Sequence, residues 1–179
     1  MYVSDPTREQ LLKTLYLLRH AKSSWAESDV ADHDRPLAPR GRRAAKKVAN
    51  HLHQRGVSPA MVLCSSASRS QETLALVAPA LRRKPTIQVD DDLYAAPAEA
   101  LLQCLRRVPD VIRSVMLIGH NPGLQDLALT LAGRGAELDR LKQGFPTAAL
   151  VTLSIPAGSW SGLGPGDAEL VDYVLPQEL

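Results

Sequence analysis

Short apolar runs alternate along this chain with amphipathic segments of helical period, and this alternation restricts the folds open to it. The runs predict buried strands at residues 14–18, 62–64, 86–89, 115–118 and 148–155. Helical periodicity fills the intervals at residues 41–52, 70–81, 98–108 and 122–131. Because strands that alternate with helices build a parallel sheet covered on both faces, we expect an α/β fold, a three-layer α/β/α sandwich.

The C-terminal part of the chain is expected to make this sheet mixed rather than wholly parallel. Residues 156–166 are rich in Gly and Pro, which is typical of a loop, and residues 169–174 look like a last strand. This strand and the one at residues 148–155 would pair as antiparallel neighbours. The predicted sheet is therefore mixed but mostly parallel.

Length and composition favour one globular domain. The chain has 179 residues, of which 45% are hydrophobic and 22% charged, enough for a substantial core. We expect a single domain over residues 14–179 after a loose polar tail over residues 1–13. Its net charge of +2 is too mild to favour a nucleic acid partner, and the apolar stretch at residues 11–18 is too short to span a membrane.

The two cysteines, Cys64 and Cys104, belong to no metal-ligand spacing, so a reduced cytoplasmic protein without a metal is expected. Cys64 does precede a serine-rich turn that ends at Arg69, as in a cysteine phosphatase loop. That stretch is one residue shorter than such a loop needs, and Cys64 is better read as a buried strand residue.

Arginine and histidine residues follow the predicted strands at three places. Arg19-His20 comes directly after the first strand, and Gly119-His120-Asn121 follows the strand at residues 115–118. Because the carboxyl ends of parallel strands meet at one edge of a sheet, the two histidines can share a site. Arg69 stands where a helix begins, and free N–H groups at such a position favour an anion. Together these residues predict a phosphate site.

Local sequence suggests how the two helices at this edge begin. Ser68 and Gln71 have the spacing of a capping box, which would place Arg69 in the first turn. Asn121 would be the N-cap of the later helix and Pro122 its first residue. Taken singly, each residue has a plain structural reading: a rim histidine with a hydrogen bond, or a solvated charge at a helix end.

Considered jointly, the segments Arg19-His20, Ser65–Thr73 and Gly119–Asn121 resemble the histidine phosphatase superfamily, which has the phosphoglycerate mutase-like fold. Residues 19–23 and 34–41 are similar to its short SixA-type branch. The resemblance runs from about residue 15 to residue 174.

The resemblance implies a role for each matched residue. His20 would be the nucleophile that takes the phosphoryl group, and Arg19, Arg69 and His120 would bind the phosphate oxygens. Ser23 and Asn121 are further candidates for substrate binding. Only a neutral imidazole is nucleophilic, and the neighbouring guanidiniums are expected to lower the pKa of His20. No metal or other cofactor is required.

The chain departs from the family pattern in ways that bear on substrate. Ala21 stands where many members have Gly, and Ala26 where mutases have Asn, which argues against mutase chemistry. Between Arg69 and His120 the chain is used up by predicted helices and strands, so no capping insertion fits and the pocket should be open. Lys22, Trp25 and Arg40 lie near the motifs without an assignable role.

The general acid is the least defined part of the site. Asp92 and Asp34 are the candidates, although a polar turn for the first and a salt bridge to Arg35 for the second explain them equally well. A phosphorylated imidazole leaves more readily than an alkoxide, so a phosphohistidine substrate needs little help from an acid.

We therefore expect a phosphatase that acts through a phospho-His20 intermediate, with protein phosphohistidine as substrate. One alternative is a small-molecule phosphomonoesterase that uses the same residues. The other is a non-catalytic phosphate-binding module, against which the presence of both His20 and His120 argues, because binding alone needs only arginines.

Overall fold

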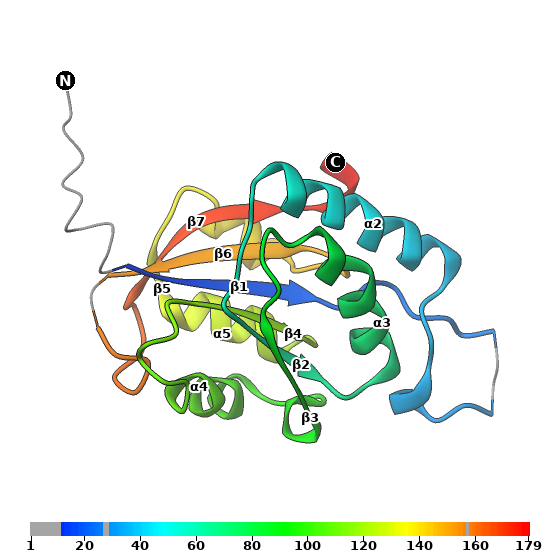
Figure 1. Ribbon diagram of the computed structural model, residues 1–179, viewed down its shortest axis with the longest axis horizontal. Coiled ribbons are helices and arrows are strands. Elements are labelled where there is room, and N and C mark those ends of the chain that lie inside the picture. The colour runs from blue at the N-terminus through cyan, green and yellow to red at the C-terminus, as the bar shows by residue number, and fades with distance from the viewer. Residues whose placement is uncertain (1–11, 27–28, 157) are drawn as a thin grey trace.

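The computed structural model describes residues 12–26, 29–156 and 158–179, which form a single sheet with helices on both faces (Figure 1). The sheet has seven strands in the order β3-β2-β4-β1-β6-β7-β5. Their bounds are β1 Lys13–Arg19, β2 Met61–Ser65, β3 Thr86–Asp90, β4 Ser114–Gly119, β5 Ala132–Arg134, β6 Leu150–Ile155 and β7 Ala168–Val174. The loose tail expected over residues 1–13 falls mainly on residues 1–11, which lie outside the described residues, and Lys13 already opens β1.

Strand pairing confirms the mixed, mostly parallel sheet. The neighbours β3, β2, β4 and β1 run parallel to one another, and the short β5 is parallel to β7. β6 is antiparallel to both β1 and β7, as the pattern at residues 148–155 and 169–174 predicts.

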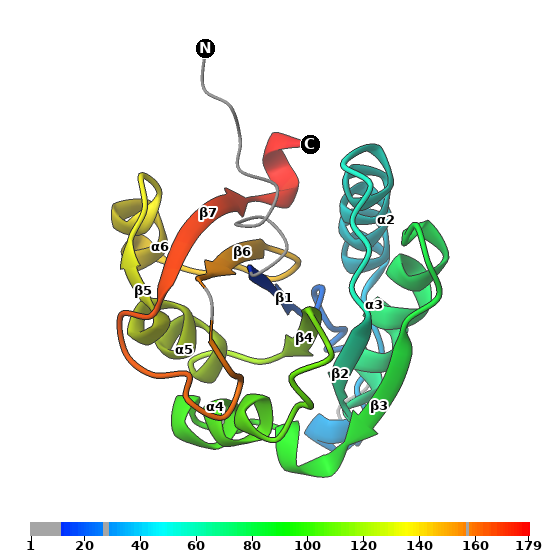
Figure 2. The same cartoon turned by 60° about the vertical axis from the view of Figure 1, so that its left-hand side comes forward.

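Helices form the outer layers and confirm the three-layer sandwich. Figure 2 shows α2 and α3 on one side of the sheet and α4, α5 and α6 on the other. The α-helices are α2 Pro39–Gln54, α3 Ser68–Val77, α4 Ala98–Arg106, α5 Gly123–Leu131 and α6 Leu138–Gln143. The 3-10 turns are η1 Asp32–Asp34, η2 Ala78–Ala80, η3 Asp91–Leu93 and η4 Pro176–Glu178. None of the described helices combines the length and apolar character needed to cross a bilayer.

Alternating side chains of the central strand β1 divide the core in two. Leu15 and Leu17 are fully buried in a cluster with the apolar faces of α4 and α5. Leu18 packs in a second cluster with α2 and α3. This period of two is the geometry of a strand that is covered on both faces.

Two short elements, β5 and α6, are absent from the sequence prediction. β5 has no apolar run, and its Gly133 is needed because a Cβ there would lie 2.5 Å from the Gly166 carbonyl oxygen. α6 has only six residues with little periodicity to detect. β5 is the edge strand farthest from β3 in the sheet order, whereas α6 ends just before Phe145, whose carbonyl accepts from Arg19.

The order of the central strands decides where the site forms. β2, β4 and β1 are adjacent and parallel, so the segments that follow them emerge at the same end of the sheet. Figure 1 shows the segment between β1 and α2 beyond the tip of the β1 arrow. The fold therefore brings together the residues that follow Arg19, Ser65 and Gly119.

Candidate active site

The two motif histidines lie side by side at the ends of neighbouring strands. Arg19 of β1 pairs in register with Gly119 of β4, so His20 and His120 each follow a matched position. The His20 backbone N–H donates to the Gly119 carbonyl at 3.1 Å. The centres of the two imidazole rings are 4.9 Å apart.

Arg69 connects the two histidines from the first turn of α3. Its Nε donates to His20 Nε2 at 3.3 Å, and its Nη2 is 3.5 Å from His120 Nδ1. The guanidinium is buried, and one edge of its fork faces both rings. A planar fork on this edge suits an anion placed between the histidines.

The expected capping box at the start of α3 is wrong. The N-cap is Ala67, Ser68 is the first helical residue, and no side chain caps the helix. Instead Ser65 Oγ accepts the Ala67 N–H at 3.3 Å. Arg69 nevertheless lies in the first turn, because the helix begins only one residue away from the predicted position.

The start of α5 also differs from the prediction. The helix begins at Gly123 with Pro122 as its N-cap, one residue later than expected. Asn121 does not cap it: its Oδ1, the atom that would accept from the helix, has no partner among the described residues, and its Nδ2 donates to the Phe145 carbonyl at 2.9 Å. Phe145 is 24 positions away in the sequence, so this contact could not be predicted from the residues around Asn121.

Arg19 contributes a second guanidinium to the site. Its Nη1 donates to the Phe145 carbonyl at 2.8 Å, which fixes the side chain. Its Nε is buried and has no hydrogen-bond partner among the described residues. A buried donor without a partner is costly, and an anionic ligand would satisfy it.

Hydrogen bonds define which nitrogen of His20 is free to react. The Ala21 carbonyl oxygen lies 2.8 Å from Nδ1 and can only accept, so Nδ1 carries the proton. Nε2, which accepts from Arg69, is then the atom with an available lone pair. The pKa of His20 is lowered to about 3, mainly by burial; the Ala21 carbonyl opposes this shift, and His120, Arg69 and Arg19 add to it. Burial, rather than the guanidiniums, is thus the main cause of its neutrality.

His120 is neutral for similar reasons. Burial, with Arg69 as the next cause, lowers the pKa of His120 to about 4. Its Nε2 is 2.7 Å from Ser65 Oγ and 3.4 Å from Ser70 Oγ. Since Arg69 donates toward Nδ1, the Nε2 proton points to Ser65. Ser65 therefore orients His120, a role that the serine-rich sequence does not single out.

The carboxylate in the site belongs to Asp32, which the sequence prediction missed. Its Oδ2 accepts from Arg69 Nη2 at 2.9 Å and from the Tyr94 hydroxyl at 2.7 Å. Its Oδ1 accepts from Arg35 Nη1 at 2.9 Å. The Tyr94 hydrogen bond, followed by Arg69, lowers the pKa of Asp32 to about 2 although partial burial opposes the shift. Asp32 is therefore ionised at neutral pH.

Neither predicted acid occupies that position. Asp34 Oδ1 lies 2.9 Å from His33 Nδ1 and is not the partner of Arg35, which pairs with Asp32. Asp92 is exposed on η3, where its backbone N–H donates to Asp90. One 3-10 turn, η1, thus carries both Asp32 toward the site and Asp34 away from it.

These side chains line a pocket with a volume of about 330 Å³. The described residues around it are Arg19, His20, Lys22, Ser23, Trp25, Asp32, Arg35, Arg69, Ala95, His120, Asn121 and Thr147. The four expected phosphate-site residues are therefore together in one pocket, with Ser23 and Asn121 at its wall. The chain from residue 70 to 119, all of it described, is used by α3, β3, α4, β4 and their turns, and leaves no capping insertion.

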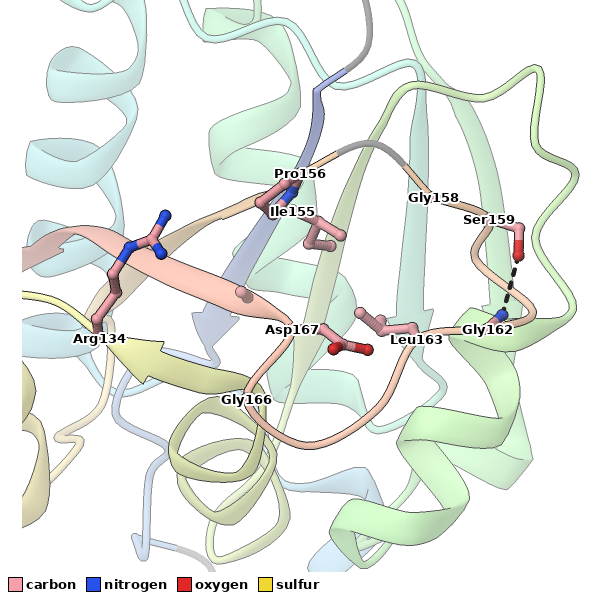
Figure 3. Close-up of a pocket in the computed structure, with 10 residues that line it drawn as sticks. Arg134, Ile155, Pro156, Gly158, Ser159, Gly162, Leu163, Gly166 and Asp167 are labelled. Atoms are coloured by element: carbon pink, nitrogen blue, oxygen red, sulfur yellow. Dashed lines mark hydrogen bonds between the residues drawn. The ribbon is translucent and has the colours of Figure 1, made fainter.

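A larger cavity of about 550 Å³ lies at the other end of the sheet, between the loop at residues 158–167 and the start of β7 (Figure 3). Its polar groups are already paired within the protein. Arg134 binds Glu169 at 2.8 Å, and Asp167 accepts the Gly164 N–H at 2.8 Å. The cavity contains neither histidine nor an unpaired cation among its described lining, so its size does not make it the better site.

Cys64 is a buried residue of β2, as predicted, and burial raises the pKa of its thiol to about 12. Such a thiol is not a nucleophile near neutral pH. No group of three or more His, Cys, Asp or Glu side chains within the described ranges is arranged to hold a metal ion.

Comparisons with known proteins agree with this geometry. Residues 15–95 match the model of the histidine phosphatase superfamily (branch 1). An uncharacterized protein of Mycobacterium tuberculosis is 35% identical to this chain over 167 residues. The match covers 89% of this chain and 100% of the relative. The SixA-type structure from Agrobacterium tumefaciens has a TM-score of 0.79 at 30% identity, with 92% of this chain and 98% of that chain covered.

A structure of the protein histidine phosphatase SixA in complex with tungstate is also similar. Its TM-score is 0.75 at 22% identity, and the match covers 92% of this chain and 98% of that one. At this identity the likeness concerns the fold, the phosphoglycerate mutase-like sandwich described above.

Proposed function

Because this chain belongs to the histidine phosphatase superfamily, in its SixA-type branch, we propose that it hydrolyses phosphohistidine on proteins through a phospho-His20 intermediate. The superfamily assignment makes it a phosphatase-type hydrolase.

The first step would be attack by His20 on the phosphorus atom. Nε2 of the neutral ring supplies the electron pair, because Nδ1 is protonated and held by the Ala21 carbonyl. A P–Nε2 bond forms while the P–N bond to the substrate imidazole breaks, and the leaving nitrogen takes a proton from water. The hydroxide formed in this way takes up the proton that the attacking water releases in the second step. Phosphoryl transfer between two imidazoles exchanges bonds of the same kind.

Hydrolysis of the intermediate would complete the cycle. A water oxygen attacks the phosphorus of phospho-His20, the P–Nε2 bond breaks, and inorganic phosphate leaves with the regenerated neutral imidazole. In both steps Arg19 and Arg69 would hold the equatorial oxygens and balance their charge. His120, whose Nδ1 faces Arg69, would help to position that guanidinium. The unpartnered Arg19 Nε supports this arrangement.

The observation that carries the substrate assignment is the state of Asp32. Tyr94 and Arg69 keep its pKa at about 2, so this carboxylate has no proton to donate at neutral pH. A sugar or glycerol phosphate needs a proton for its alkoxide, whereas an imidazole is a much better leaving group. The open pocket also suits a phosphohistidine on a folded protein. The similar structure from Agrobacterium tumefaciens is named as a phosphohistidine phosphatase, which is the same substrate class.

The test compares kcat/KM for two kinds of substrate with one enzyme preparation. The first kind is a small helical protein that phosphoramidate has phosphorylated on a single surface histidine. The second kind is a set of sugar and glycerate phosphates. We expect a preference of at least about a hundredfold for the phosphoprotein, since the ratio measures differential stabilisation of the transition states. Equal or better turnover of the metabolites would instead favour the small-molecule phosphomonoesterase.

A further inference from the structure

An exposed tryptophan stands at the mouth of the pocket. Trp25 lines the pocket together with His20, and 75% of its surface is accessible. The other tryptophan, Trp160, is fully buried. A large aromatic side chain left open to water beside a reaction site calls for an explanation, because burying it elsewhere would stabilise the fold.

Trp25 is held from one side by Arg35. The guanidinium carbon lies 3.3 Å from the centre of the indole ring, so the two planar groups are in contact. The Arg35 side chain is itself only 6% exposed. The stack leaves the outer face of the indole open and fixes its orientation, which lowers the entropy lost when a partner covers it.

Hydrogen bonds make Arg35 a rigid support for the indole. Its Nε donates to the Ser24 carbonyl, its Nη1 to Asp32 and its Nη2 to Ser23 Oγ, each at 2.9 Å. Its guanidinium is therefore bound on all three nitrogens within the protein. Through Asp32 the same support reaches Arg69, so the indole has a defined position relative to the phosphate site.

The surroundings indicate what covers the indole. Lys22 lines the same pocket, on the side of Trp25 that is nearer to His20 in the chain. An exposed tryptophan that is stacked on an arginine is typical of the central contacts of protein interfaces, where Trp and Arg are enriched. The complementary surface has apolar side chains next to an anionic group, which describes a protein patch around a phosphohistidine.

Resting on the proposed function, we infer that Trp25, supported by Arg35, is the docking contact for the protein that carries the phosphohistidine. The indole covers apolar side chains next to the modified histidine, while the phosphoryl group enters toward His20. Trp25 is thus a specificity-determining residue for protein substrates, and free phosphohistidine or phosphoramidate uses the site without it.

The experiment measures KM and kcat for Trp25→Ala and Trp25→Phe on the singly phosphorylated helical carrier and on phosphoramidate. For Trp25→Ala we expect KM for the carrier to rise about tenfold or more, as for an aromatic interface contact. The rise for phosphoramidate should be much smaller. Trp25→Phe retains an aromatic face and should recover part of the loss. Val111→Ala is the matched control, since Val111 is 81% exposed just before β4, at the opposite end of that strand from His120.

Fluorescence gives a readout independent of turnover. Because Trp160 is already buried, binding of a tryptophan-free carrier should change the emission of Trp25 alone and shift it to the blue. The Trp25→Phe variant should show no such shift.

The outcomes separate this inference from the proposed function. Normal carrier turnover by the wild type with unchanged KM in Trp25→Ala would overturn the docking role alone. An equal loss on carrier and phosphoramidate would make Trp25 a structural part of the pocket and would overturn its role as a docking contact. A wild-type enzyme that leaves the carrier phosphorylated would overturn both proposals.

Discussion

The Nε atom of Arg69 donates to Nε2 of His20 at 3.3 Å, so the fork of one residue points at the proposed nucleophilic atom of the other. With Nδ1 of His20 protonated and bound by Ala21, Arg69 marks the direction from which a phosphoryl group would approach. On phosphorylation the guanidinium would exchange this contact for the phosphoryl oxygens. The group that would bind the phosphoryl oxygens, Arg69, is thus in direct contact with the proposed nucleophile, His20.

Replacement of Arg69 should reduce activity, and the reduction should be larger when both the charge and the planar guanidinium are lost than when the charge is kept. Arg69→Ala is expected to lower kcat/KM by about a hundredfold or more, as for the loss of one strong electrostatic contact. Arg69→Lys keeps the charge but cannot face His20 and His120 together, and should recover only part of the loss. Steady-state kinetics on the phosphorylated carrier checks both variants. Full activity of Arg69→Lys would show that charge alone suffices.

Asp32→Asn should act through Arg69 and not through proton transfer. The variant keeps a side chain of the same shape but loses the charge that orients the guanidinium, so kcat/KM is expected to fall by about tenfold on every substrate. Tyr94→Phe, which removes one donor to Asp32, should give a smaller fall of the same kind. Selective loss of activity on alkyl phosphates, with phosphohistidine turnover intact, would identify Asp32 as a general acid instead.

The buried histidines should make the protein less stable below neutral pH. Burial lowers the pKa of His20 to about 3 and of His120 to about 4, whereas the unfolded chain titrates near 6.5. Below pH 6.5 the unfolded state binds protons that the folded state does not, so stability is full above this pH and falls as pH decreases. Each histidine contributes a slope of about 1.4 kcal/mol per pH unit.

Urea unfolding of the wild type and of His20→Gln between pH 5 and pH 8 measures this effect. The wild type should lose more free energy of unfolding between pH 7 and pH 5 than the variant does. Parallel curves for the two proteins would mean that His20 titrates normally in the folded state.

Cys64→Ala should retain activity, because the thiol is buried in β2 and its pKa is raised to about 12. Cys104→Ala, at the half-buried second cysteine, is the matched control and should behave alike. Rates of phosphate release from the carrier check both. Loss of turnover in a correctly folded Cys64→Ala protein would favour the cysteine mechanism.

Residues at strand ends could be predicted from the sequence, because their position depends on local patterns. His20 and His120 each follow an apolar run, and parallel neighbours bring such ends together. Arg69 was likewise predictable from its place at a helix start. The sandwich follows from the alternation of the same patterns, with only β5 and α6 too short to be detected.

The second layer of the site could not be predicted, because it depends on contacts between distant segments. Asp32 reaches Arg69 across 37 positions and Tyr94 reaches Asp32 across 62. In sequence, Asp32 and Asp34 are equivalent acidic residues before Arg35, and only the η1 turn distinguishes them. Asn121 similarly donates to the distant Phe145 carbonyl and does not cap α5.

The most direct test of the account is to trap and map the phosphoenzyme. The carrier protein, labelled with ³²P on its single histidine, is mixed with enzyme and quenched in alkali, where phosphohistidine survives. The enzyme should carry a label that is stable in base, labile in acid, and located on the peptide containing His20. His20→Ala should fold normally, form no labelled enzyme and release no phosphate above the spontaneous rate. A label on any other residue, or phosphate release by His20→Ala at the wild-type rate, would contradict the proposed mechanism.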